Sequence, residues 1–436
     1  MNSEPESAKE QGAACHRAAS GATSAATGAA LVTTAKFAAR FREVIDEKTG
    51  EIQRFTFDHR RREFVPETTA DEARTSRFQL QQAARRLLPN TRTAHCVRTL
   101  TNKVGGVGIL KHKVTGKAHY SGLQTCGSPW NCPVCSAKIS ERRKIEIREA
   151  VNTHVAAGGG VEMVTLTLRH SRQDVLSQLM ERLRNARRKM IKHRDYRELR
   201  RLFEVLGSIR ALEVTHGDAN GWHPHFHELW LLPAPLTVRQ RATLQRLLFS
   251  AWSSASVAAG LPAPSRVRGV HVQQAHSAAD YVAKWGTEPR WDSATELTRA
   301  NSKRSRSAKG RTPFDLLRAY AEGDSQAGAL FAEFAGAFKG FNQCRWSTGL
   351  KALFGVAEAS DAEIAAAQEE PAERVTQITL DQWRAVLRQP YEARTLVLHL
   401  AETGGHEAVA RYIFDLLLLP TPTARIPGSV PDRCGT

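Results

Sequence analysis

Apolar residues along the middle of the chain recur at two different spacings. Residues 161–169, 208–215, 222–232 and 266–274 are short runs rich in apolar and β-branched side chains, and the first alternates with a period of two. Such runs predict strands. A turn cluster of Gly, Asp and Asn at 217–221 separates the second run from the third, so these two strands are expected to form an antiparallel hairpin.

Longer segments place apolar residues at helical spacing. Thr237 is suited to cap the helix that begins after it, because its hydroxyl can accept a hydrogen bond from a free backbone N–H of the first turn. A short helix is expected after Ser277, and it carries Tyr281 and Lys284. The other predicted helices cover residues 74–88, 136–157, 176–201, 237–259, 314–338 and 376–419.

The chain carries a large positive charge. Its 436 residues include 62 Lys and Arg against 44 Asp and Glu, a formal net charge of +18. Because such a charge attracts polyanions, it favours a nucleic-acid partner. No apolar run approaches the roughly 20 residues that span a bilayer. The N-terminus also lacks a basic stretch followed by an apolar core. We therefore expect a cytoplasmic protein without membrane contact.

The basic residues are concentrated in two segments. Residues 182–201 hold ten Lys and Arg against two acids, and residues 299–311 hold six Lys and Arg and no acid. Lys and Arg that face phosphates release counterions and give salt-dependent affinity. A solvated helix face is the alternative interpretation. The residues predicted to contact DNA are Arg184, Arg187, Arg188, Lys189, Lys192, Lys303, Arg304 and Arg306.

Three histidines alternate on the third predicted strand. A period of two places His223, His225 and His227 on one face of that strand. Glu213 lies on the strand expected to pair with it, close to the turn. A site of two histidines and a carboxylate is suited to a catalytic divalent ion that also holds a phosphate oxygen. Strand histidines that bind no ligand are the alternative interpretation.

A tyrosine and a lysine share a helix face further along the chain. Tyr281 and Lys284 are three residues apart, so their side chains are neighbours on a helix. An ammonium group in that position favours the phenolate or neutralises phosphate charge. A tyrosine that attacks phosphorus forms a covalent phosphotyrosine and retains the energy of the broken phosphodiester. A helix surface without a catalytic role is the alternative for this pair.

Three of the seven cysteines are close together in the sequence. Cys126, Cys132 and Cys135 include a Cys-x-x-Cys pair, which is typical of a structural zinc site with four ligands. Reduced, buried thiols are the alternative interpretation. The candidates for the fourth ligand, in order of preference, are Cys96, His119 and His95.

These motifs, in their order along the chain, resemble those of a known family. The matching stretches are residues 122–139, 165–170, 222–230, 281–285 and 345–350. Together they resemble the rolling-circle replication initiators of bacterial plasmids, within the His-hydrophobic-His endonuclease superfamily. The resemblance covers about residues 94–354.

The resemblance implies a fold and a division of the chain. The expected fold is α+β, with a central antiparallel sheet of about five strands flanked by helices, a small zinc-binding segment before it and a helical C-terminal appendage. The first 35 residues are poor in large apolar side chains, and residues 358–373 hold six acids and no base. The predicted division is a disordered tail at 1–35, a basic N-terminal segment at 36–90, a zinc-binding segment at 91–157, a nicking endonuclease domain at 158–356, an acidic linker at 357–375, and a helical appendage with its tail at 376–436.

The resemblance also implies a function. His225 and His227 would bind Mg²⁺ or Mn²⁺, and Tyr281 would nick one DNA strand at the double-strand origin of a plasmid, with Lys284 beside the phosphate. The products would be a 5′-phosphotyrosyl DNA and a free 3′-OH that primes the host polymerase, and the strands would later be rejoined. The partners would be DNA and the host helicase and replication machinery. The cofactors would be Mg²⁺ or Mn²⁺ for catalysis and Zn²⁺ for structure.

Two other functions are compatible with the motifs. A single-Tyr transposase or mobilisation relaxase uses the same chemistry on other DNA. A non-catalytic, zinc-containing DNA-binding regulator would account for the charge and the cysteines, but it leaves the alternating histidines before Tyr281 unexplained. One position departs from the family: some relatives have a glutamate four residues before the tyrosine, to activate water at termination, and this chain has Ser277 there.

Overall fold

The computed structural model divides the chain into two units, residues 1–67 and residues 68–436. It describes residues 41–45, 52–58, 63–66, 70–102, 105–275, 310–368 and 370–419. The first unit contains the strands β1 (Phe41–Ile45), β2 (Ile52–Asp58) and β3 (Glu63–Pro66), which form an antiparallel sheet in the order β1-β2-β3. The predicted basic segment 36–90 therefore contains this sheet and helix α1 (Ala70–Leu87) of the second unit. The predicted disordered tail lies outside the described residues.

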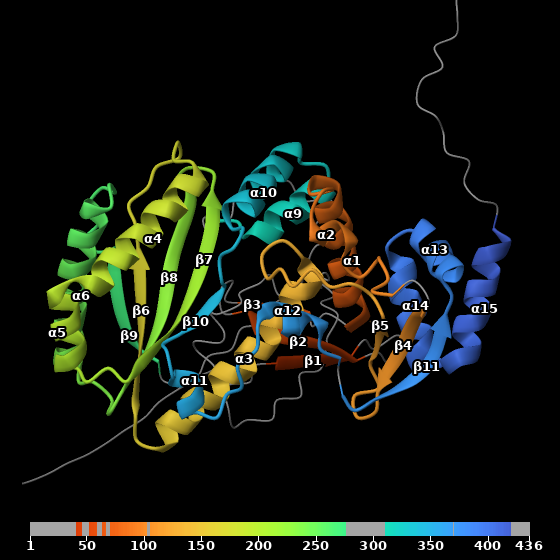
Figure 1. The fold of residues 1–436 in the computed structure, drawn as a ribbon, viewed down its shortest axis with the longest axis horizontal. Helices are drawn as coiled ribbons and strands as arrows, with labels where there is room; N and C mark the ends of the chain where they lie inside the picture. The colour runs from red at the N-terminus through yellow and green to blue at the C-terminus, as the bar shows by residue number, and fades with distance from the viewer. Residues whose placement is uncertain are drawn as a thin grey trace, which may run out of the picture. The chain divides into compact units, whose positions relative to one another are not determined.

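A five-stranded sheet is the centre of the second unit (Figure 1). Its strands are β6 (Gly160–Thr167), β7 (Gly207–Gly217), β8 (Gly221–Leu232), β9 (Val270–Gln274) and β10 (Cys344–Trp346). Their order is β10-β7-β8-β6-β9, and each neighbouring pair is antiparallel. The predicted α+β fold with a five-stranded antiparallel sheet is confirmed, as is the hairpin formed by β7 and β8.

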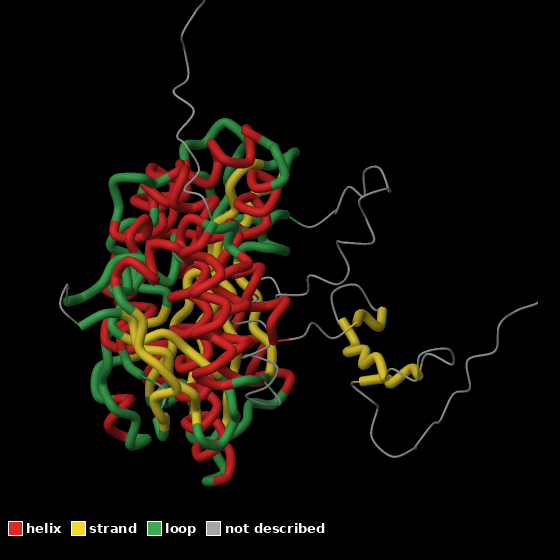
Figure 2. Tube along the Cα trace, turned by 90° about the vertical axis from the view of Figure 1, so that its right-hand side faces the viewer, coloured by secondary structure: helices red, strands yellow, loops and turns green. Residues whose placement is uncertain are grey.

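Helices pack against both faces of this sheet (Figures 1 and 2). Leu166, Phe226 and Trp230 belong to one core with side chains of the helices α4 (Leu176–Lys192), α6 (Val238–Ala258), α9 (Pro313–Ala321) and α10 (Ser325–Ala337). Leu229 and Leu231 point to the opposite face, where they pack with Ile147 and Val151 of α3 (Pro133–Ala156). Successive residues of a strand face opposite sides, so β8 contributes to both cores.

One predicted helix is divided in the structure, and the cap predicted for another is confirmed. The predicted helix 176–201 is two helices, α4 and α5 (Arg194–Leu202), because His193 adopts an extended backbone and its side chain caps α5 by accepting a hydrogen bond from the Asp195 N–H. The predicted cap at Thr237 is confirmed: its side chain accepts from the Gln240 N–H, and the Gln240 side chain bonds back to the Thr237 backbone. The described residues include no helix that is long and apolar enough to cross a membrane.

A second, smaller sheet joins the two ends of the second unit. It consists of β4 (Val107–His112), β5 (Ala118–Ser121) and β11 (Ala372–Ile378), in the antiparallel order β11-β4-β5. The C-terminal helices α13 (Leu380–Arg388), α14 (Glu392–Thr403) and α15 (Gly405–Leu418) cover it and share one apolar core with it. The segment predicted as an appendage is therefore integrated with residues 70–123, since burying its apolar face requires them.

Three short helices complete the described elements. They are α2 (Arg92–His95), α11 (Leu350–Leu353) and α12 (Asp361–Ala366). The range predicted as an acidic linker thus contains α12 and the beginning of β11. One of its acids, Asp361, accepts a hydrogen bond from Arg143 of α3 at 2.9 Å, so it anchors this stretch to the preceding segment.

Candidate active site and metal centres

The β7–β8 hairpin brings together a carboxylate and two imidazoles. Glu213 of β7 lies opposite His225 of β8 in the strand register, and residues opposite each other share a face of the sheet. His227 follows on the same face, two residues further along β8. The third strand, β6, places Thr165 opposite His227. The cluster therefore rests on three paired strands and has a rigid backbone.

The ligand atoms of this cluster converge on one point. The Nε2 atoms of His225 and His227 are 3.0 Å apart. Oε2 of Glu213 lies 3.1 Å from Nε2 of His227 and 3.5 Å from Nε2 of His225. Two ligands about 2.1 Å from one octahedral ion and 90° apart are themselves about 3.0 Å apart. The spacing of the two imidazoles therefore fits a single divalent ion.

Hydrogen bonds behind the imidazoles direct their lone pairs into the cluster. Nδ1 of His227 is 3.0 Å from Oγ1 of Thr165, and Nδ1 of His225 is 3.2 Å from the carbonyl oxygen of His223. A carbonyl can only accept, so Nδ1–H of His225 donates and its Nε2 is the basic nitrogen. Thr165 can hold His227 in the same tautomer. Such outer partners orient metal-ligating histidines in proteins.

The electrostatics of the cluster favour a negatively charged carboxylate. Burial alone would raise the pKa of Glu213, but in the absence of an ion the facing His225 and His227 rings, when either carries a proton on Nε2, outweigh it and hold the pKa well below its usual value. A bound cation would take the place of that proton. An ionised carboxylate beside two neutral imidazoles is the donor set that Mg²⁺ or Mn²⁺ accepts. Glu213, His225 and His227 are the residues that would hold such an ion.

His223 does not join this cluster, contrary to the sequence-based expectation. Its Nδ1 is 2.7 Å from Nε2 of His170, and Nδ1 of His170 is 3.0 Å from the carbonyl oxygen of Asn220. Burial lowers the pKa of His223 to about 4, so the ring is neutral near pH 7. The reason is its position, because His223 is one strand repeat closer to the turn and within reach of the loop that follows β6.

The predicted nucleophile lies outside the described residues. Tyr281, Lys284 and Ser277 all fall between the end of β9 and residue 310. Their roles stay predictions. Sequence reasoning missed Thr165 and His170 as supporting residues, although both belong to the stretch 165–170 that resembles the family.

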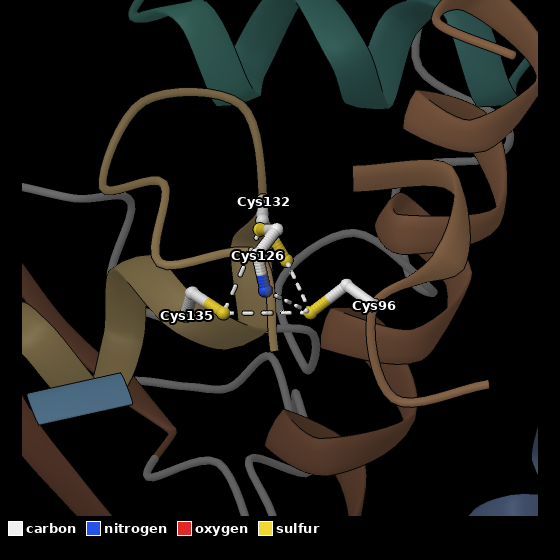
Figure 3. Close-up of side chains that lie close together, drawn as sticks. All are labelled: Cys96, Cys126, Cys132 and Cys135. Carbon is white, nitrogen blue, oxygen red and sulfur yellow. Dashed lines mark hydrogen bonds between the residues drawn. The ribbon is translucent and has the colours of Figure 1, made fainter. Parts of the chain in front are cut away.

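Four cysteines form a second candidate metal centre (Figure 3). Cys96 ends α2, Cys126 lies in the loop between β5 and α3, and Cys132 and Cys135 lie at the beginning of α3. Their sulfur atoms are directed toward one another, with distances of 3.4 Å from Cys96 to Cys135, 3.6 Å from Cys96 to Cys132 and 3.7 Å from Cys126 to Cys135. Four thiolates about 2.3 Å from one tetrahedral Zn²⁺ are about 3.8 Å apart.

The surroundings of the cysteines also fit zinc. All four are at most 7 % exposed, and none of them forms a disulfide. Backbone N–H groups point at two of the sulfurs: Cys126 N is 3.4 Å from Sγ of Cys96, and Ser128 N is 3.5 Å from Sγ of Cys126. Hydrogen bonds from the other cysteines, that of Cys132 first, hold the pKa of Cys126 below its usual value. The structure therefore places the first-choice fourth ligand, Cys96, with the other three.

A buried arginine lies next to this centre. Arg394 of α14 is 2 % exposed, and among the described residues it pairs with no carboxylate. It donates to Oε1 of Gln81 at 2.7 Å, and Nε2 of Gln81 donates to the carbonyl oxygen of Cys96 at 2.9 Å and faces Sγ of Cys132 at 3.9 Å. A buried cation is costly unless an anion compensates it. Four thiolates around a Zn²⁺ ion would carry a net negative charge and would provide this compensation.

The residues predicted to contact DNA divide into three groups. Arg184, Arg188, Lys189 and Lys192 lie on the exposed face of α4, where DNA can reach them. Lys303, Arg304 and Arg306 lie outside the described residues. The prediction for Arg187 is wrong, because this side chain is buried and its Nε donates to Glu228 at 2.7 Å. Glu228 is itself fully buried, so the pair is part of the core.

Replacing Arg187 by alanine is expected to destabilise the fold. The change leaves Glu228 buried without its cation, at a cost of about 3–5 kcal/mol. The exposed neighbour Arg188 is the matched control, and its replacement by alanine is expected to cost less than about 0.5 kcal/mol. Urea unfolding of both variants measures the difference. Equal stability of the two variants, with DNA affinity lost only in Arg187→Ala, would show that Arg187 contacts DNA after all.

The range matched by a known protein family contains most of the residues of both candidate centres. Residues 118–241 match the family described as replication protein, and this range contains Glu213, His225, His227 and three of the four clustered cysteines. A protein named Protein rep from Streptomyces lividans is 28% identical over 373 residues, which cover 69% of this chain and 81% of that protein. A neomycin resistance protein from Streptomyces cyanogenus is 35% identical over 148 residues, which cover 28% of this chain and 34% of that protein.

No solved structure matches the chain. The resemblance to replication initiators, predicted from the order of the motifs, is confirmed by the family match and by the relative named Protein rep. The match to replication proteins also makes DNA the partner of this chain.

Proposed function

We propose that this replication protein initiates rolling-circle replication of a plasmid by nicking one DNA strand at the double-strand origin. The nucleophile is Tyr281, the product is a 5′-phosphotyrosyl DNA with a free 3′-OH, and the reverse reaction rejoins strands. The match to replication proteins supports the coarser part of the proposal. The observation that carries the finer part is the convergence of Glu213, His225 and His227 on one point.

The described residues have distinct tasks in this mechanism. Glu213, His225 and His227 hold the ion, and Thr165 and the carbonyl of His223 keep the two imidazoles in the binding tautomer. A bound Mg²⁺ or Mn²⁺ supplies a Lewis acid for the scissile phosphodiester. The exposed basic face of α4 is suited to hold the strand through its phosphates.

The proposed reaction of the tyrosine is a transesterification, in which one phosphate ester replaces another. Its phenolate oxygen forms a bond to phosphorus, and the bond from phosphorus to the 3′ oxygen breaks. The phenolic proton leaves the tyrosine and the 3′ oxygen takes up a proton, so the products are a phosphotyrosine and a 3′-OH. Lys284, three residues away on the expected helix, neutralises phosphate charge.

The length of the chain is compatible with this role for Tyr281. Gln274, the last residue of β9, pairs with Glu162, which is three positions from Thr165 on β6. That separation is about 10 Å along the strand. With residues 274–277 extended and the expected helix from Ser277 to Tyr281, this stretch can span up to about 16 Å. The tyrosine is therefore within reach of the Glu213 cluster.

A covalent-trapping assay tests the proposed function. Supercoiled plasmid that carries this gene and its flanks is incubated with the purified protein and Mn²⁺. We expect a nicked circle with protein attached to a 5′ end, and no nick in the presence of a chelator or with His227→Ala. A protein that binds the plasmid DNA but produces neither a nick nor an adduct, whether the DNA is supercoiled or relaxed, would contradict the proposal. This result would favour the non-catalytic regulator.

A further inference from the structure

A large groove lies on the part of the second unit that holds the four cysteines. Its volume is about 1270 Å³, and its walls are α1, α2, β5 with the loop that follows it, α3 and the end of α12. No residue of β7 or β8 lines it, so Glu213, His225 and His227 belong to a different site. The nicking chemistry gives this groove no role.

The groove is strongly basic. Seven Lys and Arg residues line it, whereas Glu141 is the only acid among the lining residues. Arg92 and Lys117 are exposed and come from opposite walls, α2 and the edge of β5. Nearby acids neutralise part of this charge: Arg74 bonds to Asp71 and Glu402, and Glu402 also lies 3.7 Å from Lys117.

Two further lining cations also have carboxylates nearby. Lys144 lies 3.7 Å from the exposed Glu141. Arg142 lies 3.4 Å from the buried Glu146, which also pairs with Arg143 and Lys351, and these two cations have Asp361 and Glu358 as further partners. The lining itself still holds seven cations against one acid, and this excess of positive charge attracts a polyanion.

The aromatic residues of the groove indicate which polyanion fits. Phe78 is 5% exposed, and the guanidinium of Arg394 covers its ring at 4.1 Å. Tyr120 donates its hydroxyl hydrogen to the carbonyl of Arg394 and packs edge-on against Trp383. Phe78 is therefore covered, and Tyr120 is half-buried with its hydroxyl already bonded, so these two rings are poorly placed for the base stacking that generally holds single strands. Contacts through phosphates alone favour a double strand.

The four cysteines connect the walls of the groove. Cys96 ends α2, Cys126 lies in the loop between β5 and α3, and Cys135 lies in α3 and itself lines the groove. The backbone turns sharply after Cys96, where Val97 has a φ of 49°, and the N–H of Val97 bonds to the carbonyl of Gln124 in the facing loop. An ion held by the cysteines would therefore fix the distance between the basic walls.

We propose that this groove binds the phosphate backbone of duplex DNA at a site separate from the nicking centre, and that the four-cysteine centre holds its walls in place. Duplex binding here would keep the double-stranded origin on the protein while one strand reaches the Glu213 cluster. The proposal rests on the proposed function only for the identity of that DNA. The binding itself follows from the charge and the shape of the groove.

The test removes three cations of the groove in the full-length protein. Arg92, Lys117 and Lys144 are replaced together by alanine, and the matched control replaces the exposed Arg384, Arg388 and Arg411, which do not line the groove. The probe is a fluorescent duplex of random sequence, titrated over a range of salt concentrations. The groove variant is expected to lose about 10–100-fold in affinity, and the slope of log affinity against log salt should become shallower by about 2–3. The control should stay within about twofold of the unmodified protein.

A second readout separates this proposal from the proposed function. The groove variant should fail to nick supercoiled plasmid. It should still cleave a single-stranded oligonucleotide that contains the nick site, which is mapped beforehand with the unmodified protein. If the unmodified protein nicks nothing but the groove variant still loses duplex affinity, the proposed function fails and the groove proposal stands. Equal duplex affinity and salt slope in the groove variant and the control would overturn the groove proposal.

Zinc content and thermal unfolding show whether the groove variant is folded. If it is not, the single substitutions Arg92→Gln and Lys117→Gln replace it, because each removes one charge from an exposed side chain. Each is expected to make the salt slope shallower by about 1. An unchanged slope in both would overturn the proposal.

Discussion

Replacing Tyr281 by phenylalanine is expected to abolish the covalent protein–DNA adduct and to lower the nicking rate by a factor on the order of 10⁴ or more. Phenylalanine keeps the ring but lacks the oxygen that attacks phosphorus. DNA affinity should stay within a few fold, because phosphate contacts by Lys and Arg supply most of it. Denaturing gel electrophoresis of radiolabelled plasmid measures the adduct, and fluorescence anisotropy measures the affinity.

The matched control for this experiment is Tyr320→Phe. Tyr320 is the next tyrosine along the chain, and it packs beside the core of α9 and α10. Its replacement should leave nicking unchanged. Nicking at the unmodified rate by Tyr281→Phe would refute the assignment of the nucleophile. Loss of nicking in both variants would point to a general loss of structure.

If the four cysteines hold the proposed structural zinc, replacing Cys132 by serine is expected to remove it and to unfold the part of the chain around it. Cys132 is fully buried, and its sulfur lies 3.6 Å from that of Cys96. Structural zinc contributes about 10–16 kcal/mol of binding free energy, which matches or exceeds the roughly 5–15 kcal/mol of a typical domain. We therefore expect a large loss of soluble protein and of bound zinc, measured by elemental analysis.

The unfolding should extend to the C-terminal helices. Arg394 of α14 connects to the cysteines through Gln81, and without an anionic centre its charge is buried and uncompensated. Hydrogen exchange should therefore accelerate in α14 together with α2. The control is Cys344→Ser, because Cys344 lies in β10, outside the cluster. Normal zinc content and stability in Cys132→Ser would contradict a structural zinc site.

Local patterns in the sequence were sufficient to predict four strands of the five-stranded sheet, the longer helices and most of the candidate ligands of both centres, but neither of the two three-stranded sheets. The alternation of His225 and His227 placed them on one face because the side-chain period of a strand is two. The turn at 217–221 predicted the hairpin that brings Glu213 beside them, and the strand register agrees with that prediction. The spacing of Cys132 and Cys135 predicted a zinc site for the same kind of reason, since both ligands lie within one helical turn.

Contacts between distant parts of the chain were decided only by the tertiary structure. The three-residue strand β10 carries too little pattern to be recognised, and it becomes a strand because the edge of β7 offers unpaired backbone groups. Arg187 is indistinguishable from its basic neighbours in the sequence, yet it lies on the buried face of α4, where it donates to Glu228. Gln81 and Arg394 are 313 residues apart and bond to each other beside the cysteines.

Local patterns thus indicated candidate ligands such as His225, His227, Cys132 and Cys135, because strand and helix periods act over a few residues. The packing of the whole unit determined which charges are buried, which strand completes the sheet, and that β11 pairs with β4. These outcomes depend on apolar surfaces and backbone groups that find partners hundreds of residues away, so no local pattern encodes them.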